Sequence, residues 1–148
     1  MKLENFSFVK NPKLILYTTI LVVVLFFIIK YILKNIKKSD DQKIIGAVNS
    51  EINSSNLSFT SAEFKIMADR LETAMRGAGT DENTIYQILG QLQNKDDWFQ
   101  LVSAFGVRSY GNWFYTAEGT LPHWLDTELI TEEKTKVLEI LLKIGVTI

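Results

Sequence analysis

The stretch Met75-Arg76-Gly77-Ala78-Gly79-Thr80-Asp81-Glu82 decides how the second half of the chain folds. It follows one amphipathic run, supplies two glycines for a turn and then begins a second amphipathic run. Gly77 is in the position where glycine commonly ends a helix. Thr80 is a typical N-cap residue. The two acids after it, Asp81 and Glu82, would interact favourably with the positive N-terminal end of the dipole of a new helix. The stretch therefore predicts two helices joined by a glycine loop.

Outward from this loop, apolar residues recur at helical spacing and predict five helices. The predicted ranges are 61–76, 80–92, 94–105, 121–129 and 131–144. Thr60 and Glu63 form a capping-box pattern ahead of the first of them. The core-facing residues expected in the last helix are Val137, Leu138, Leu141, Leu142 and Ile144. Because no segment shows the alternation of a strand, we predict a compact all-α domain over residues 59–148.

The N-terminal part is strongly apolar. Residues 14–29 carry no charge, and the apolar character continues to Leu33. About 20 such residues cross a bilayer, the run lacks a polar stripe, and no signal-peptide cleavage pattern follows it. We therefore predict an N-terminal flank at 1–13 and a transmembrane helix at 14–33 that anchors a single-pass protein in the lipid bilayer. Residues 34–58 read as a basic juxtamembrane segment and flexible linker.

Charge is divided unevenly along the chain. Residues 1–43 contain eight lysines and three acids, a net charge of +5, whereas residues 44–148 have a net charge of -6. Five lysines follow the apolar segment and three precede it, so the positive-inside rule favours a cytoplasmic C-terminal domain. Bacterial signal anchors often place that domain outside, so both orientations stay open. The acidic domain argues against nucleic-acid binding, and the absence of cysteine excludes disulfides and thiolate metal sites.

The stretch at 75–82 resembles the M-K-G-x-G-T-D-E signature of an annexin repeat. Tyr110-Gly111 resembles the Y-G of that repeat, and Leu125-Asp126-Thr127-Glu128-Leu129 resembles its L-x-x-E-L segment on the fourth helix. The resemblance covers about residues 59–144 and implies a five-helix annexin-like fold. The chain departs from the family in having one repeat, an N-terminal apolar segment and an insertion around residues 113–115. It looks similar to small anchored single-repeat proteins of bacteria and their phages.

The resemblance also implies a candidate calcium site, since annexin loops offer carbonyl oxygens to calcium and this ion prefers oxygen ligands. The ligands carried over are the carbonyls of Met75, Gly77 and Gly79 and the carboxylate of Glu128. Glu118 is a rival for Glu128, because its distance from the loop in the sequence is nearer the usual spacing of the family. The same residues equally suit the ending and capping of helices without any ion, so both readings stay open.

An aromatic cluster follows the third predicted helix. Trp113, Phe114 and Tyr115, with Tyr110 close by, form a candidate surface for a protein partner. The alternative is that these rings fold back and cover a small core.

The sequence gives no catalytic constellation. It has no cysteine nucleophile, no G-x-S-x-G elbow and no phosphate-binding glycine motif. Its one histidine, His123, is expected on the exposed side of a helix, and Glu118 alone does not make the acid pair of a glycosidase. We therefore predict a non-enzymatic, membrane-tethered binding or scaffolding module with no cofactor other than calcium. The alternative function is calcium-dependent phospholipid binding through the glycine loop and Glu128.

Overall fold

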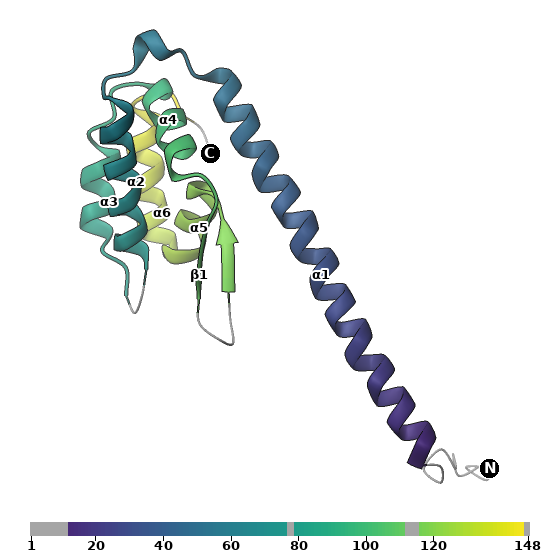
Figure 1. Cartoon of the computed structure of the whole chain (residues 1–148). Coiled ribbons are helices and arrows are strands. Elements are labelled where there is room, and N and C mark those ends of the chain that lie inside the picture. The colour runs from purple at the N-terminus through teal and green to yellow at the C-terminus, as the bar shows by residue number, and fades with distance from the viewer. Residues whose placement is uncertain (1–11, 77–78, 112–115, 147–148) are drawn as a thin grey trace, which may run out of the picture. The chain divides into compact units, whose positions relative to one another are not determined.

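The computed structural model describes residues 12–76, 79–111 and 116–146 and is mostly helical (Figure 1). The elements in order are α1 (Pro12–Glu51), the 3-10 helix η1 (Ser54–Asn56), α2 (Ser61–Met75), α3 (Glu82–Leu89), α4 (Lys95–Phe105), β1 (Arg108–Gly111), β2 (Thr116–Gly119), α5 (Leu121–Glu128) and α6 (Thr131–Leu142). The chain divides into two compact units, residues 1–37 and residues 38–148. The division therefore falls inside α1.

In the first unit, the α1 side chains from Ile20 to Leu33 are exposed. Within the described residues, no helix has both the length and the apolar character needed to cross a membrane. The predicted transmembrane helix at 14–33 was therefore wrong, and so was the predicted location as a single-pass membrane protein with a cytoplasmic bias. The uncharged run is interrupted by Lys30 after sixteen residues.

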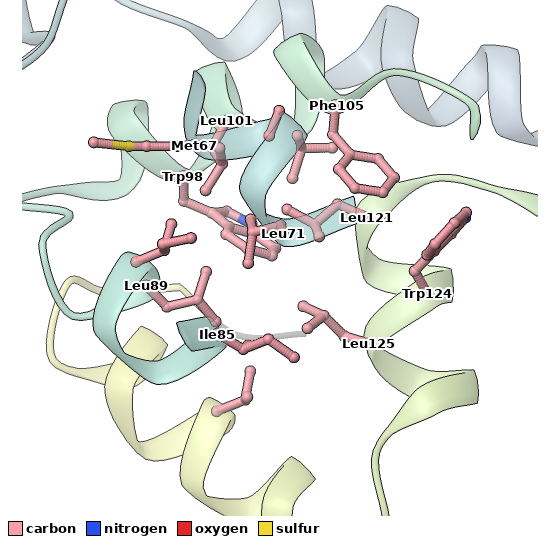
Figure 2. Packing of buried hydrophobic residues seen from close by; sticks show 14 of the residues in the cluster. Met67, Leu71, Ile85, Leu89, Trp98, Leu101, Phe105, Leu121, Trp124 and Leu125 are labelled. Carbon is pink, nitrogen blue, oxygen red and sulfur yellow. The ribbon is translucent and has the colours of Figure 1, made fainter. Parts of the chain in front are cut away.

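In the second unit, the five predicted helices are present as α2 to α6. We call residues 59–146 the helical body. Within it, α2 packs against α3, α4 and α5, and α6 packs against α3. Figure 2 shows side chains from α2, α3, α4 and α5 converging on the same space. The fully buried side chains include Phe64, Leu71, Met75, Ile85, Ile88, Leu89, Leu101, Leu121, Trp124 and Leu141.

Local capping explains where these helices begin. The Thr60 Oγ1 atom accepts a hydrogen bond from the Glu63 amide at 3.3 Å, and a Glu63 carboxylate oxygen accepts one from the Thr60 amide at 2.7 Å. The predicted capping box is therefore confirmed, and the bond from the Thr60 amide lowers the pKa of Glu63. Helix α3 differs, because Asp81 and not Thr80 is its N-cap and accepts the Thr84 amide at 3.1 Å. The Thr80 hydroxyl bonds elsewhere, as described below.

Between α4 and α5 the chain forms a β-hairpin that the sequence pattern did not predict. Strands β1 and β2 are antiparallel, with Arg108 opposite Gly119 and Gly111 opposite Thr116. Each strand has four residues, the shortest length over which an apolar–polar alternation indicates a strand. The chain leaves α4 at Gly106, whose φ of +63° and ψ of -145° fall in a region that only glycine adopts without strain.

Helix α6 is less buried than its apolar pattern predicted. Val137 and Leu141 are buried, Leu138 and Ile144 are half-buried, and Leu142 is 55% exposed. Because α6 packs against α3, only one of its apolar stripes enters the core. The prediction that Leu142 faces the core was therefore wrong.

The range 34–58, for which we expected a flexible linker, is helical as far as Glu51. Ile45 and Val48 of α1 and Leu57 after η1 pack against the core of the helical body. We call residues 38–58, which belong to the second unit, the arm.

Candidate functional site

Thr80, in the described part of the glycine loop between α2 and α3, contacts the end of α5. The Thr80 hydroxyl donates a hydrogen bond to the backbone carbonyl of Glu128 at 3.3 Å, across 48 residues of sequence. Gly79 has a φ of +94°, which favours glycine, and the Asp81 amide donates to the Ala74 carbonyl at 2.9 Å. The structure therefore places the described part of the loop against the backbone of Glu128, and the calcium site itself stays a prediction.

The four predicted calcium ligands are placed unequally. Met75 ends α2 and is fully buried as a side chain, whereas Gly77 lies outside the described residues. Gly79 precedes Thr80 in the chain, and the Thr80 hydroxyl donates a hydrogen bond to the Glu128 carbonyl. In the described part of the chain, no three His, Asp or Glu side chains are grouped to hold a metal. An ion at this position would therefore depend largely on main-chain carbonyls.

The alternative acidic ligand, Glu118, is connected in the described contacts to the residues beside the glycine loop only through Ser109. It lies on β2 opposite Ser109, whose carbonyl accepts a hydrogen bond from Arg76 at 3.2 Å. The backbone carbonyl of Glu128, by contrast, accepts a hydrogen bond from the hydroxyl of Thr80 in the loop itself. The backbone of Glu128 is therefore in direct contact with the loop, and the choice between the two carboxylates as calcium ligand stays a prediction.

The predicted aromatic partner surface cannot be placed from the structure. Trp113, Phe114 and Tyr115 lie outside the described residues. This surface stays a prediction.

The start of strand β1 is fixed to α2 by Arg108. Its guanidinium forms ion pairs with Glu72 and, at 2.8 Å, with Asp69. Its Nε atom donates to the Phe105 carbonyl at 2.9 Å, and the guanidinium lies 4.7 Å from the centre of the Phe105 ring. The Trp124 indole N–H donates to the Arg108 carbonyl at 3.3 Å. Arg108 therefore joins α2, α4 and α5 at the start of β1.

A second polar cluster lies at the N-terminus of α4, where Asp96 and Asp97 are 3% and 0% exposed. The Asp96 carboxylate accepts the Asn53 amide at 3.0 Å and the Asn56 side-chain amide at 2.9 Å. These two bonds, the Asn53 amide foremost, lower the pKa of Asp96. The Asp97 carboxylate accepts the Ser58 amide at 2.8 Å and the Gln93 amide at 2.9 Å. We call this arrangement the aspartate clamp.

An apolar groove lies between α5 and α6, with a volume of about 290 Å³. Its lining residues are Pro122, Leu125, Asp126, Leu129, Lys134, Val137 and Leu138. The two charged residues bond to each other, since the Lys134 ammonium lies 2.8 Å from an Asp126 carboxylate oxygen. The hydrogen bond from Lys134 lowers the pKa of Asp126. The groove therefore combines an apolar lining with a polar pair that is already satisfied.

A wider and shallower depression of about 560 Å³ runs between α2 and α3. Its carboxylates are already used, because Asp69 pairs with Arg108 and Asp81 caps α3. The wider depression thus contains two carboxylates, and each of them already has a partner in the described structure.

Comparison with known proteins adds no relative, since no family model, curated protein or solved structure matches the chain. The resemblance to an annexin repeat therefore rests on the residues alone and stays a prediction.

Proposed function

We propose that this protein is a non-enzymatic binding or scaffolding module that holds a protein partner in the groove between α5 and α6. The observation that carries the proposal is the apolar lining of this groove, with Leu125, Leu129 and Val137 buried and Pro122 and Leu138 half-buried. Partners in such grooves are held chiefly by one or two large apolar side chains in a desolvated pocket.

The charge of the protein indicates the chemistry of the partner. Residues 44–148 have a net charge of -6, so a segment with basic residues around its apolar anchor is attracted to the helical body. Because Asp126 and Lys134 neutralise each other, the groove itself selects for an apolar group. The expected partner is therefore a protein segment that inserts a bulky apolar side chain and carries lysine or arginine beside it.

Site-specific photo-crosslinking in the native cell tests this proposal. A photoreactive phenylalanine analogue at position 138 is expected to give a discrete crosslinked product. The matched control places the same analogue at Ile66, which is apolar and 59% exposed on α2, and is expected to give no such product. The double variant with Leu125→Ser in the groove should lose the position-138 product. Equal products from both positions, or none from position 138, would contradict the proposal.

A second candidate function is calcium-dependent phospholipid binding by the glycine loop. It is supported by the contact between Thr80 and the Glu128 carbonyl, which brings the loop beside a carboxylate residue. With loop carbonyls and one carboxylate, calcium affinity is expected to be weak, on the order of 10⁻⁴–10⁻³ M. An ion with open coordination positions would bridge to the phosphate oxygens of a lipid headgroup.

Calorimetric titration of the full chain with calcium, with and without anionic phospholipid vesicles, tests this second function. Binding should tighten when vesicles are present and disappear in Glu128→Gln. The matched control is Glu132→Gln, which neutralises an exposed acid in the first turn of α6 and should leave binding unchanged. Absence of heat at millimolar calcium, or unchanged binding in Glu128→Gln, would exclude the site.

A further inference from the structure

The arm and the helical body are joined mainly at their edges. Every buried apolar side chain in the described core belongs to residues 64–146, whereas the arm contributes only half-buried Ile45, Val48 and Leu57 from the same set of described residues. Separation of the arm would therefore expose the edge of the core and leave its centre covered. Segments with few buried contacts open locally at much lower free energy than the whole fold.

The described hydrogen bonds between arm and body are concentrated at the aspartate clamp. Three of the four donors to the Asp96 and Asp97 carboxylates belong to the arm: the Asn53 amide, the Asn56 side chain and the Ser58 amide. Asn94, the N-cap of α4, adds a bond from its side-chain amide to the Asn56 carbonyl at 2.9 Å. The N-terminus of α4 thus binds residues 53–58 through a single cluster of hydrogen bonds.

Helix capping alone does not explain this cluster. Acids in the first turn of a helix interact favourably with its dipole while they remain in water, as the exposed Glu132 does in α6. Asp96 and Asp97 are instead almost completely buried, and a buried carboxylate is costly unless hydrogen bonds replace its lost water. The arm supplies those bonds, so its docking and the burial of the two acids depend on each other.

We propose that the aspartate clamp is a releasable latch, which holds the arm on the helical body and, when opened, leaves the body folded on a tether. With the latch closed, the last turns of α1 are fixed to the body. With it open, residues 52–58 become a free connection between α1 and the body. The device thus regulates whether the last turns of α1 stay docked on the body.

Hydrogen exchange of the full chain, followed by mass spectrometry, tests the latch through Asp96→Ala. In the described contacts the Asp96 carboxylate bonds only to Asn53 and Asn56 of the arm, so this change acts on the arm side of the clamp. Exchange in residues 52–58 is expected to rise by about tenfold or more, the equivalent of one hydrogen bond to a charged group. Exchange in α2 and α4 should keep its original rate.

Two further variants make the test specific. Asn56→Ala removes the arm's side-chain donor to the same carboxylate and should raise exchange in the same segment, and the two changes together should have less than their summed effect. Asp40→Ala removes an exposed acid of α1 that pairs only with the nearby Lys43 in the described contacts, and it should leave residues 52–58 unchanged. Uniform loss of protection across α2 and α4 in Asp96→Ala would show that the arm is inseparable from the fold. That result, or unchanged exchange in residues 52–58, would overturn the proposal.

Discussion

Replacement of Trp124 by alanine is expected to lower the free energy of unfolding by about 3–5 kcal/mol, the usual cost of removing a large aromatic side chain from a core. Trp124 is fully buried, and its ring packs edge-on against Phe105 with 5.5 Å between centroids. Its indole N–H also donates to the Arg108 carbonyl. The substitution would therefore remove apolar packing, an aromatic contact and a hydrogen bond together. Chemical denaturation followed by far-UV circular dichroism measures the loss.

The matched control for Trp124→Ala is Ile66→Ala, because Ile66 is apolar but 59% exposed. This change should alter stability by no more than about 0.5 kcal/mol. Trp124→Phe keeps most of the ring packing and should lie between the two variants. If Trp124→Ala cost no more than Ile66→Ala, α5 would not be packed into the core as described.

Replacement of Asp97 by alanine is expected to lower the free energy of unfolding by about 3 kcal/mol. The Asp97 carboxylate is fully buried and accepts the backbone amides of Ser58 and Gln93. A hydrogen bond to a charged group contributes roughly 1.5–3 kcal/mol, and the two amides would lose their acceptors. Because Gln93 belongs to the helical body, this variant weakens the body itself, in contrast to Asp96→Ala.

Glu132→Ala is the matched control for Asp97→Ala, since both acids lie in the first turn of a helix and Glu132 is exposed. Loss of its interaction with the helix dipole should cost about 0.3–1 kcal/mol. Thermal or chemical denaturation of the two variants under identical salt compares them directly. Equal losses would mean that Asp97 acts only on the helix dipole and that its bonds to Ser58 and Gln93 contribute little.

Local chemistry made most of the helical body predictable. Thr60 with Glu63 and Asn94 with Asp97 are three residues apart, so their caps are visible in the sequence. Asp97 also lies four residues before Leu101 and eight before Phe105, on the buried side of α4. That position was a signal that the carboxylate is buried, although the sequence does not identify its donors in the arm.

Contacts between distant residues were not predictable in this way. Arg108 lies 39 residues from Asp69 and 36 from Glu72, and no local spacing indicates such pairs. The apolar pattern of α6 did not distinguish the buried Val137 from the groove residue Leu138, because the neighbours of the helix decide which stripe is covered. For the candidate calcium site, the motif placed Glu128 near the loop, and the bond from Thr80 agrees with that placement. The transmembrane helix predicted at 14–33 was wrong, because no helix in the described residues combines the length and apolar character needed to cross a membrane.

The packing of α6 has a consequence for the order of events during synthesis. Helix α2 meets α3, α4 and α5, all of which follow it closely in the chain, whereas α6 completes the body by returning to α3. A nascent chain that has not yet released residues 131–142 from the ribosome therefore leaves one side of α3 uncovered. Since domains are made at about 5–20 residues per second, this side of α3 stays uncovered until residues 131–142 have been synthesised and released.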